Sequence, residues 1–342
     1  MPANHLNPSP ATHPHPAQRA ATPDEMAEGV LAVLAGAPPD MVAARLRVPT
    51  ADLAEAIEVY QQAGRAALDT QAATDDWYQV HVQFPDWAAA EHTAATGLDP
   101  PLGHLQDTGV IAGWWFIRKA PCWRLRLTPG HHVEHAKMRA SVNPILDRLT
   151  TSGLISRWRQ TRYEPETAAF GGRSGIAIAH DLFCADSNNI LAYLRDPKPP
   201  IGRRELSVLL CATLFRAAGQ EWFECADIWH RVTHLRPIPT DTPTDRLTEL
   251  AESLRTLLAC DTRPTGALFD THGPLGFAAP WATAFHHAGH ALATAANQGT
   301  LKRGTRDILT HHVIFHWNRT GLLTTTQSIL AHAAKTAILS TP

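Results

Sequence analysis

Several features that commonly mark a protein's class are missing from this sequence of 342 residues. Its longest apolar runs, such as Gly113 to Ile117, are far too short to cross a bilayer, so no membrane span is expected. The five cysteines are odd in number and never stand in a C-x-x-C pair. This pattern predicts neither a disulfide framework nor a zinc knuckle, and it indicates a reducing, cytoplasmic location. The formal net charge of -2 gives no overall basic field for non-specific nucleic-acid binding.

The common nucleotide and hydrolase motifs are missing as well. No G-x-G-x-x-G follows a strand pattern, and neither G-x-x-x-x-G-K-[ST] nor G-x-S-x-G occurs. The sequence therefore gives no support to a Rossmann domain, a P-loop domain or a serine hydrolase, and no cofactor is expected.

The N-terminal part divides into a tail and a small helical module. Residues 1–22 are rich in Pro, His, Ala and Asn and lack the basic start and apolar core of a secretory signal, which predicts a disordered tail. Residues 23–70 are alanine-rich and carry three helix-start signals. Their spacing resembles a helix-turn-helix, but the last helix presents Asp52, Glu55 and Glu58 where a DNA reader needs basic or amide side chains. DNA binding is therefore not expected, and a packing or peptide-docking role is favoured.

From Trp77 the pattern predicts an α+β domain that covers residues 77–340. Alternating apolar and polar residues from Trp77 to Phe84 predict a half-buried strand, which is followed by a helix over about 86–96 and a loop at Pro100 and Pro101. The next elements are expected as two strands, 114–119 and 123–127, a helix over about 135–149 and a strand within 153–163. Strand, helix, strand, strand, helix, strand is the order of a ferredoxin-like unit with an antiparallel sheet. Beyond Gly172 the sequence predicts a helical layer over the sheet, with helices near 175–195, 203–217, 221–235, 244–260, 280–300, 305–319 and 324–339.

Arg124 and Arg126 are the strongest local signal for chemistry. They stand two residues apart in a predicted strand, so both side chains face one side of the sheet while Leu125 and Leu127 face the core. Arg118, in the neighbouring strand pattern, could add a third cation on that side. Three arginines on a small sheet would hold a carboxylate or a phosphate. A solvated strand face paired with carboxylates is the equally supported alternative.

Further candidates follow in the next two elements. Tyr163 and Glu166 end a predicted strand that runs into Phe170-Gly171-Gly172, where the glycines predict a tight turn at the sheet edge. A purely structural turn is the alternative. Asp186 and Ser187 lie in the following helical pattern, where they could hydrogen-bond a substrate backbone, although capping a helix turn is the favoured interpretation.

A third group of candidates lies near the C-terminus. His312, His316 and Arg319 recur at i, i+4 and i+7, which places them on one face of a predicted helix. Two such histidines can ligate a metal, but no third ligand or H-E-x-x-H pattern accompanies them. No metal site is therefore predicted, and the histidines are expected to form hydrogen bonds or to face a pocket.

A set of short segments, taken in order, carries a resemblance that extends from Trp77 to the C-terminus. The segments are Trp115-Phe116-Ile117-Arg118, Trp123-Arg-Leu-Arg-Leu127, Tyr163-Glu-Pro-Glu166 with Phe170-Gly171-Gly172, Leu182-Phe183 with Ala185-Asp186-Ser187, and Asn318-Arg319. Together they resemble the C-terminal, elimination-type domain of lantibiotic dehydratases, which also occurs as the stand-alone thiopeptide-type bacteriocin biosynthesis protein.

The resemblance implies an enzyme of the lyase type that tailors a ribosomally made precursor peptide, leader and core. Eliminating members remove the Cα proton of a glutamylated serine or threonine and expel glutamate, which leaves a dehydroamino acid. A related branch joins two dehydroalanines in a formal [4+2] cycloaddition that closes a thiopeptide macrocycle. The implied partners are the precursor peptide and a separate glutamyl-transferring dehydratase subunit. A homodimer is left open.

The resemblance also assigns roles to residues. Eliminating members carry an arginine immediately before the aromatic-Gly-Gly and a histidine four residues before Asn-Arg, whereas this chain has Ala169 and Ile314 there. These departures favour the ring-forming branch or another non-eliminating branch, and a subunit that only binds peptide is the third alternative. The catalytic residues expected from the resemblance are Arg124, Arg126, Tyr163 and His316, and the expected substrate-binding residues are Arg118, Glu166, Asp186, Ser187, Asn318 and Arg319.

Overall fold

The computed structural model describes residues 21–75, 77–240 and 242–340. The described residues fall into two compact units, which divide after Leu68. Of the tail expected over residues 1–22, residues 1–20 lie outside the described residues, and Thr22 caps the first helix.

The first unit is built on three helices, α1 (Pro23–Leu34), α2 (Pro39–Leu46) and α3 (Thr50–Asp75), the last of which continues past residue 68. Thr22 and Glu25 form a reciprocal capping box at the start of α1, which satisfies two backbone N–H groups that a helix leaves unpaired. Val30, Val42 and Leu53 are buried together and form the centre of its small core.

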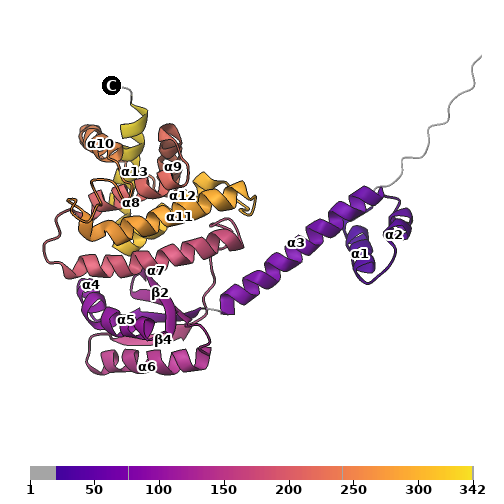
Figure 1. The fold of residues 1–342 in the computed structure, drawn as a ribbon, viewed down its shortest axis with the longest axis horizontal. Helices are drawn as coiled ribbons and strands as arrows, with labels where there is room; N and C mark the ends of the chain where they lie inside the picture. The colour runs from indigo at the N-terminus through magenta and orange to yellow at the C-terminus, as the bar shows by residue number, and fades with distance from the viewer. Residues whose placement is uncertain (1–20, 76, 241, 341–342) are drawn as a thin grey trace, which may run out of the picture. The chain divides into compact units, whose positions relative to one another are not determined.

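The sheet of the second unit has four strands, β1 (Tyr78–Gln83), β2 (Ile111–Lys119), β3 (Cys122–Pro129) and β4 (Arg157–Thr161). Their order is β2-β3-β1-β4, and every neighbouring pair is antiparallel. Helix α6 (His135–Thr151) connects β3 to β4, and Figure 1 shows the sheet between α6 on one side and α7 on the other. The expected ferredoxin-like α+β arrangement is confirmed.

The connection between β1 and β2 differs from the prediction. It contains α4 (Ala90–Thr93), a π-helical turn (Ala94–Leu98) and α5 (Asp99–Asp107). The prediction of a loop at Pro100 and Pro101 is therefore wrong. The two prolines occupy the first turn of α5, where backbone N–H groups have no helical acceptor, so the missing N–H of proline costs little stability.

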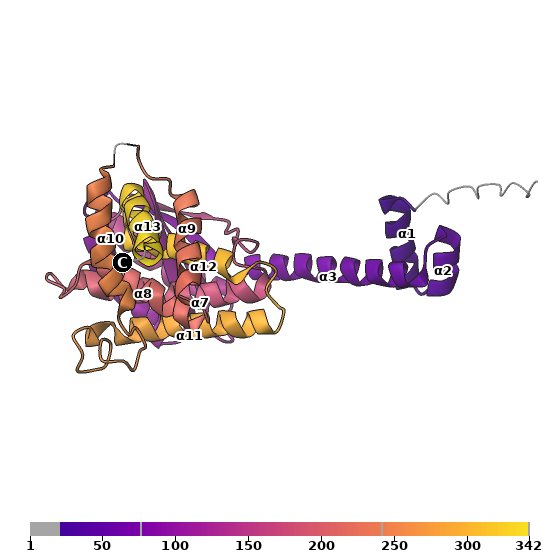
Figure 2. The ribbon, with the colours of Figure 1, turned by 90° about the horizontal axis from the view of Figure 1, so that it is seen from above.

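The rest of the chain is the expected helical layer, and each predicted helix is present within about three residues of its predicted bounds. Figures 1 and 2 both show α13 lying between α9 and α10, while α7 and α12 contact the edge strand β2. Among the helices that the structure describes, none combines the length and the apolar composition that a membrane span requires. The helices are α7 (Arg173–Arg195), α8 (Arg203–Ala217), α9 (Trp222–Leu235), α10 (Thr244–Ala259), α11 (Ala279–Asn297), α12 (Thr305–Thr320) and α13 (Thr324–Leu339), with a short 3-10 turn at Gly276–Ala278.

Candidate functional site

The strand register determines which side chains share a face of the sheet. In β1, Gln79 lies opposite Arg126 and His81 lies opposite Arg124, so these four side chains point to one side. This holds because opposed residues of an antiparallel pair face the same side of the sheet. Val80 and Leu125, the opposed pair between these two, point to the opposite side of the sheet. We call the side that carries Arg124 and Arg126 the polar face.

Arg118 does not belong to this face, so the prediction that it adds a third cation beside Arg124 and Arg126 is wrong. The two-residue connection between β2 and β3 sets a register in which Arg118 pairs with Trp123, while Ile117 pairs with Arg124. The Arg118 guanidinium forms an ion pair with Glu91, which also pairs with Arg203. Despite burial of this carboxyl, the two arginines lower the pKa of Glu91 to about 2.

Arg126 lies against two aromatic rings that meet edge-to-face at the inner end of the polar face. Its guanidinium carbon lies 4.1 Å from the ring centre of Trp115 and 4.5 Å from that of Tyr163. Its Nε donates a hydrogen bond of 2.8 Å to Oε1 of Gln79. Its Nη1 is buried and has no hydrogen-bond partner among the described residues. Burial lowers the pKa of Arg126 to about 10, so the side chain remains a cation at neutral pH.

Tyr163 and His180 form a buried hydrogen-bonded pair beside this arginine. The Tyr163 hydroxyl lies 2.8 Å from Nε2 of His180, on α7. Burial, followed by the charge of Arg126, lowers the pKa of His180 to about 3, and burial raises the pKa of Tyr163 well above its usual range. Both groups are therefore neutral over the physiological pH range. Trp77 packs on His180 with ring centres 4.7 Å apart.

His180 was not among the candidates from the sequence. The sequence signal for it was the spacing Ile176, His180 and Phe183, that is i, i+4 and i+7, which places all three on the buried face of α7, where a polar side chain requires a partner.

The predicted residue Glu166 is exposed. Its negative charge raises the pKa of Arg126, but this effect is smaller than those of burial and of Tyr163.

The glycine turn predicted after Tyr163 is present. Gly171 and Gly172 adopt φ values of 82° and 94°, a region that favours glycine. The N–H of Lys302 donates a hydrogen bond of 2.8 Å to the Gly171 carbonyl, so the turn packs against the segment that precedes α12. Ala169, just before this turn, packs against the core, and Ile314 is buried within it.

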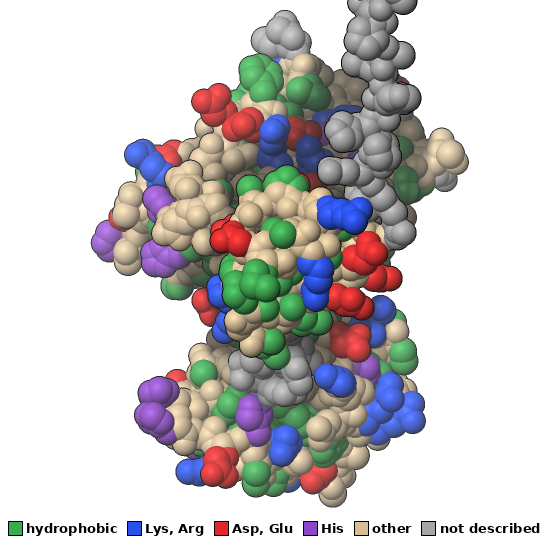
Figure 3. All heavy atoms as spheres, turned by 90° about the vertical axis from the view of Figure 1, so that its right-hand side faces the viewer, with side chains coloured by type: hydrophobic (Ala, Val, Ile, Leu, Met, Phe, Trp, Pro, Cys, Tyr) green, Lys and Arg blue, Asp and Glu red, His purple; other side chains and the backbone are tan. Residues whose placement is uncertain are grey.

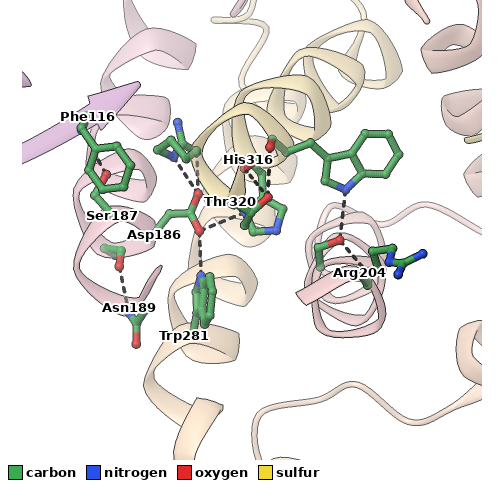
Figure 4. Close-up of polar contacts among 12 residues, drawn as sticks. Phe116, Asp186, Ser187, Asn189, Arg204, Trp281, His316 and Thr320 are labelled. Atoms are coloured by element: carbon green, nitrogen blue, oxygen red, sulfur yellow. Dashed lines mark hydrogen bonds and ion pairs between the residues drawn. The ribbon is translucent and has the colours of Figure 1, made fainter. Parts of the chain in front are cut away.

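Asp186 is the centre of a second, fully buried network that joins α7, α11 and α12 (Figure 4). Its Oδ1 accepts a hydrogen bond of 2.8 Å from Trp281 Nε1, its Oδ2 accepts one of 2.7 Å from Arg319 Nε, and both oxygens lie 3.0 Å from Nδ1 of His316. Burial alone would raise the pKa of Asp186, but His316 and Arg319 outweigh it and hold the pKa below its usual range.

The expected capping role of Asp186 and Ser187 is wrong, because both lie in the interior of α7. The Ser187 hydroxyl instead accepts a hydrogen bond of 3.2 Å from the Phe116 N–H of β2 (Figure 4). This contact satisfies a backbone donor on an edge strand, so Ser187 ties the helix to the sheet.

The remaining predicted residues lie in different surroundings. His312 is buried between Phe170 and Phe183, neither of its ring nitrogens has a hydrogen-bond partner among the described residues, and burial lowers its pKa to about 3. Asn318 accepts a hydrogen bond of 3.0 Å from Gln327 and lines a hollow of about 360 Å³ with Arg118. In the part of the chain that the structure describes, no three His, Cys, Asp or Glu residues are grouped to hold a metal ion.

Apart from the exposed Glu166 and the separately buried His312, the structure thus separates the candidates into three groups. Arg124, Arg126 and Tyr163 share the polar face, and they are joined there by His180. A second group, Asp186, His316 and Arg319, forms the closed network under the helices, with Ser187 beside it, while Arg118 and Asn318 share the third location. Only the first group combines a cation, a neutral proton donor and a neutral proton acceptor.

Comparison with solved structures shows that the fold of this chain occurs in other proteins. The solved structures that share it include the tRNA-dependent lantibiotic dehydratase MibB from Microbispora sp. 107891 (TM-score 0.55, 17% identity, 78% of this chain and 28% of that one), the pyridine synthase TbtD from thiomuracin biosynthesis (0.54, 13%, 77% and 97%) and TsrL (0.51, 16%, 76% and 93%). The chain thus spans only about 28% of the length of MibB. No curated protein matches it.

The sequence itself also matches a family model. The match covers residues 77–338, which contain the sheet, the polar face and the whole helical layer. Because it extends over well more than half of the sequence, the chain belongs to the lantibiotic biosynthesis dehydratase C-terminal family.

Proposed function

We propose that the protein tailors a ribosomally made precursor peptide in the cytoplasm and catalyses a ring-forming, formal [4+2] cycloaddition between two dehydroalanines. Its substrate would be a peptide that a separate, glutamyl-transferring dehydratase has already dehydrated. Family membership and the fold shared with a lantibiotic dehydratase and a pyridine synthase support a peptide-tailoring role. The single observation that carries the choice of step is the neutral Tyr163–His180 pair beside Arg126.

Glutamate elimination is disfavoured because it needs a base to remove a Cα proton. A general base is most effective when its pKa is near the working pH. His180, with a pKa of about 3, holds a proton too weakly for this work. At the two positions where eliminating members carry an arginine and a histidine, this chain has Ala169 and Ile314, which can neither hold a carboxylate nor transfer a proton.

A neutral donor–acceptor pair suits the ring-forming step. Two dehydroalanines can combine when the backbone amide before one of them becomes its iminol tautomer, because C(OH)=N–C=CH2 is a four-atom diene. This change moves the amide proton from nitrogen to oxygen, and no proton is gained or lost overall. In a concerted relay, Tyr163 donates its hydroxyl proton to the amide oxygen, its own oxygen takes the Nε2 proton of His180, and the other ring nitrogen of His180 takes the amide proton. No imidazolium forms, so the low pKa of His180 does not oppose the relay. Tyr163 ends in its starting form and His180 ends as the other neutral tautomer.

Arg126 would assist by stabilising charge on the amide oxygen. Its Nη1 is a buried donor without a partner among the described residues, and such a preorganised donor is worth far more than one in water. Contacts with the rings of Trp115 and Tyr163, together with the hydrogen bond to Gln79, hold the guanidinium in place and keep this donor oriented.

The test is Tyr163→Phe, which removes only the hydroxyl. We expect the rate of ring closure to fall by about 10²–10⁴-fold with peptide affinity little changed, because the hydroxyl acts in the chemical step. Tyr193→Phe is the matched control, since it removes a tyrosine hydroxyl that hydrogen-bonds only the Ile201 carbonyl within the helical layer. Equal rates for the two variants would contradict the proposed role of Tyr163.

A further inference from the structure

The outer part of the polar face carries a second concentration of charge that the proposed chemistry does not use. A hollow of about 430 Å³ lies between the β2–β3 hairpin and the start of β4. The register places Arg159, His81 and Arg124 in one row across three strands. The next row contains Arg157 in β4 and Lys119 in β2, so four permanent cations line the hollow.

These cations are not balanced by the protein. No carboxylate lines the hollow, and none of the four forms an ion pair with an acidic residue in the described parts of the chain. Within the described residues, the Arg157 side chain donates to the Gln83 amide oxygen alone, at 2.8 Å, and Arg159 Nη2 lies 3.4 Å from Nδ1 of His81. Partial burial and then the charges of Arg124 and Arg159 lower the pKa of His81, so this histidine adds no further charge at neutral pH. With a net charge of -2 for the whole chain, the basic character is local.

Strand β4, which borders this hollow, is an edge strand. It pairs with β1 on one side and with no other strand in the described sheet. Helix α6 lies on one of its faces, where Trp158 Nε1 donates a hydrogen bond of 3.0 Å to Asp147, but its residues are exposed or half-buried throughout and no described strand pairs with its outer edge. An open edge offers backbone N–H and C=O groups that an extended peptide can pair with. Arg157 and Arg159 stand two residues apart on it, and their side chains therefore face the hollow together.

We propose that β4 and the cationic hollow form a docking site for an acidic, extended segment of the substrate peptide, with carboxylates on alternate residues. The peptide adds as a strand to β4, and its carboxylates meet Arg157 and Arg159 at the common strand spacing. The site deepens the proposed function, because it names the part of the peptide that is bound away from Tyr163 and Arg126. A nucleic acid would satisfy the charges, but it has no backbone amides to pair with β4, so the edge strand favours a peptide.

The test uses the full chain and short fluorescent peptides. The probe alternates glutamate with valine or threonine, and the comparison probe carries lysine in place of each glutamate. We expect the acidic peptide to bind with an affinity that falls as salt rises, and the basic peptide not to bind. Hydrogen exchange should show new protection of the backbone amides of residues 157–161 in the complex.

Charge reversal provides the matched control. Arg157→Glu with Arg159→Glu should weaken binding of the acidic peptide by about tenfold or more, because two attractions become repulsions. Lys137→Glu with Arg148→Glu introduces the same change of charge at exposed positions of α6, on the other side of the sheet, and should leave binding nearly unchanged. Both pairs are on the surface, so neither should affect folding.

Three results would overturn the docking site: equal effects of the two double substitutions, no protection of β4, or tighter binding of a single-stranded RNA than of the acidic peptide. Binding is measured without chemistry, so its outcome is separate from the proposed function. A chain that binds the acidic peptide but closes no ring would refute the cycloaddition alone. A chain that closes the ring with unchanged KM after Arg157→Glu and Arg159→Glu would refute the docking site alone.

Discussion

Acidification should destabilise this protein well before its carboxylates titrate, because His180 and His312 are buried as neutral rings. Each has a folded-state pKa of about 3, whereas an unfolded histidine has a pKa of about 6.5. The unfolded state therefore binds more protons between these values, and stability falls as pH falls through about 6.5 and continues to fall towards 3. From pH 7 to pH 5 the expected loss is about 2 kcal/mol for each histidine.

The assay is urea unfolding followed by tryptophan fluorescence at pH 7 and pH 5. This window excludes the carboxylates whose folded pKa is lowered, such as Glu91, because their contribution is lost only below about pH 4.5. His312→Phe should reduce the pH-dependent loss by about 2 kcal/mol, since His312 lies among aromatic rings and makes no hydrogen bond to any described residue that phenylalanine would break. His312→Leu serves as a second variant if phenylalanine overfills the site. An unchanged loss between pH 7 and pH 5 in the variants would refute the assignment of a buried neutral imidazole.

Two further predictions concern the other groups. Asp186→Asn should destabilise the fold by about 3–5 kcal/mol, because it leaves the Arg319 charge buried and uncompensated. Adding Arg319→Met should recover part of this loss in a thermal unfolding measurement, and no recovery would show that the ion pair is not the cause. Arg126→Ala should abolish conversion of the precursor peptide, and normal binding and processing by this variant would show that the site lies elsewhere.

The strands and helices could be predicted from sequence because their signals are local. Alternation with a period of two showed that Arg124 and Arg126 share a face, and the helix-start signals placed each helix of the C-terminal half. The position of Arg118 could not be read in this way. Its side depends on the register that the β2–β3 hairpin imposes, in which Ile117 rather than Arg118 lies opposite Arg124.

The grouping of the candidate residues depends on tertiary packing, and the sequence does not reveal it. Asp186 meets His316 across 130 residues of chain, and nothing local to either residue predicts the pair. His180 was missed for a related reason. Its partner Tyr163 lies before the glycine turn, and only the packing of α7 on the sheet brings the ring to the hydroxyl.

The central claim is tested most directly by mass spectrometry of two synthetic peptides incubated with the purified full chain. One peptide contains two dehydroalanines, and the other carries a serine esterified with glutamate. Cycloaddition should convert the first peptide to a macrocycle, commonly with loss of the leader segment, and leave the second at its starting mass. Loss of glutamate from the second peptide, with a dehydroamino acid left behind, would contradict the account. Because the cycloaddition itself conserves mass until water and the leader are lost, the first peptide is also fragmented. Unchanged masses for both peptides, together with the fragment pattern of a linear chain for the first, would also contradict the account and would leave a subunit that only binds peptide.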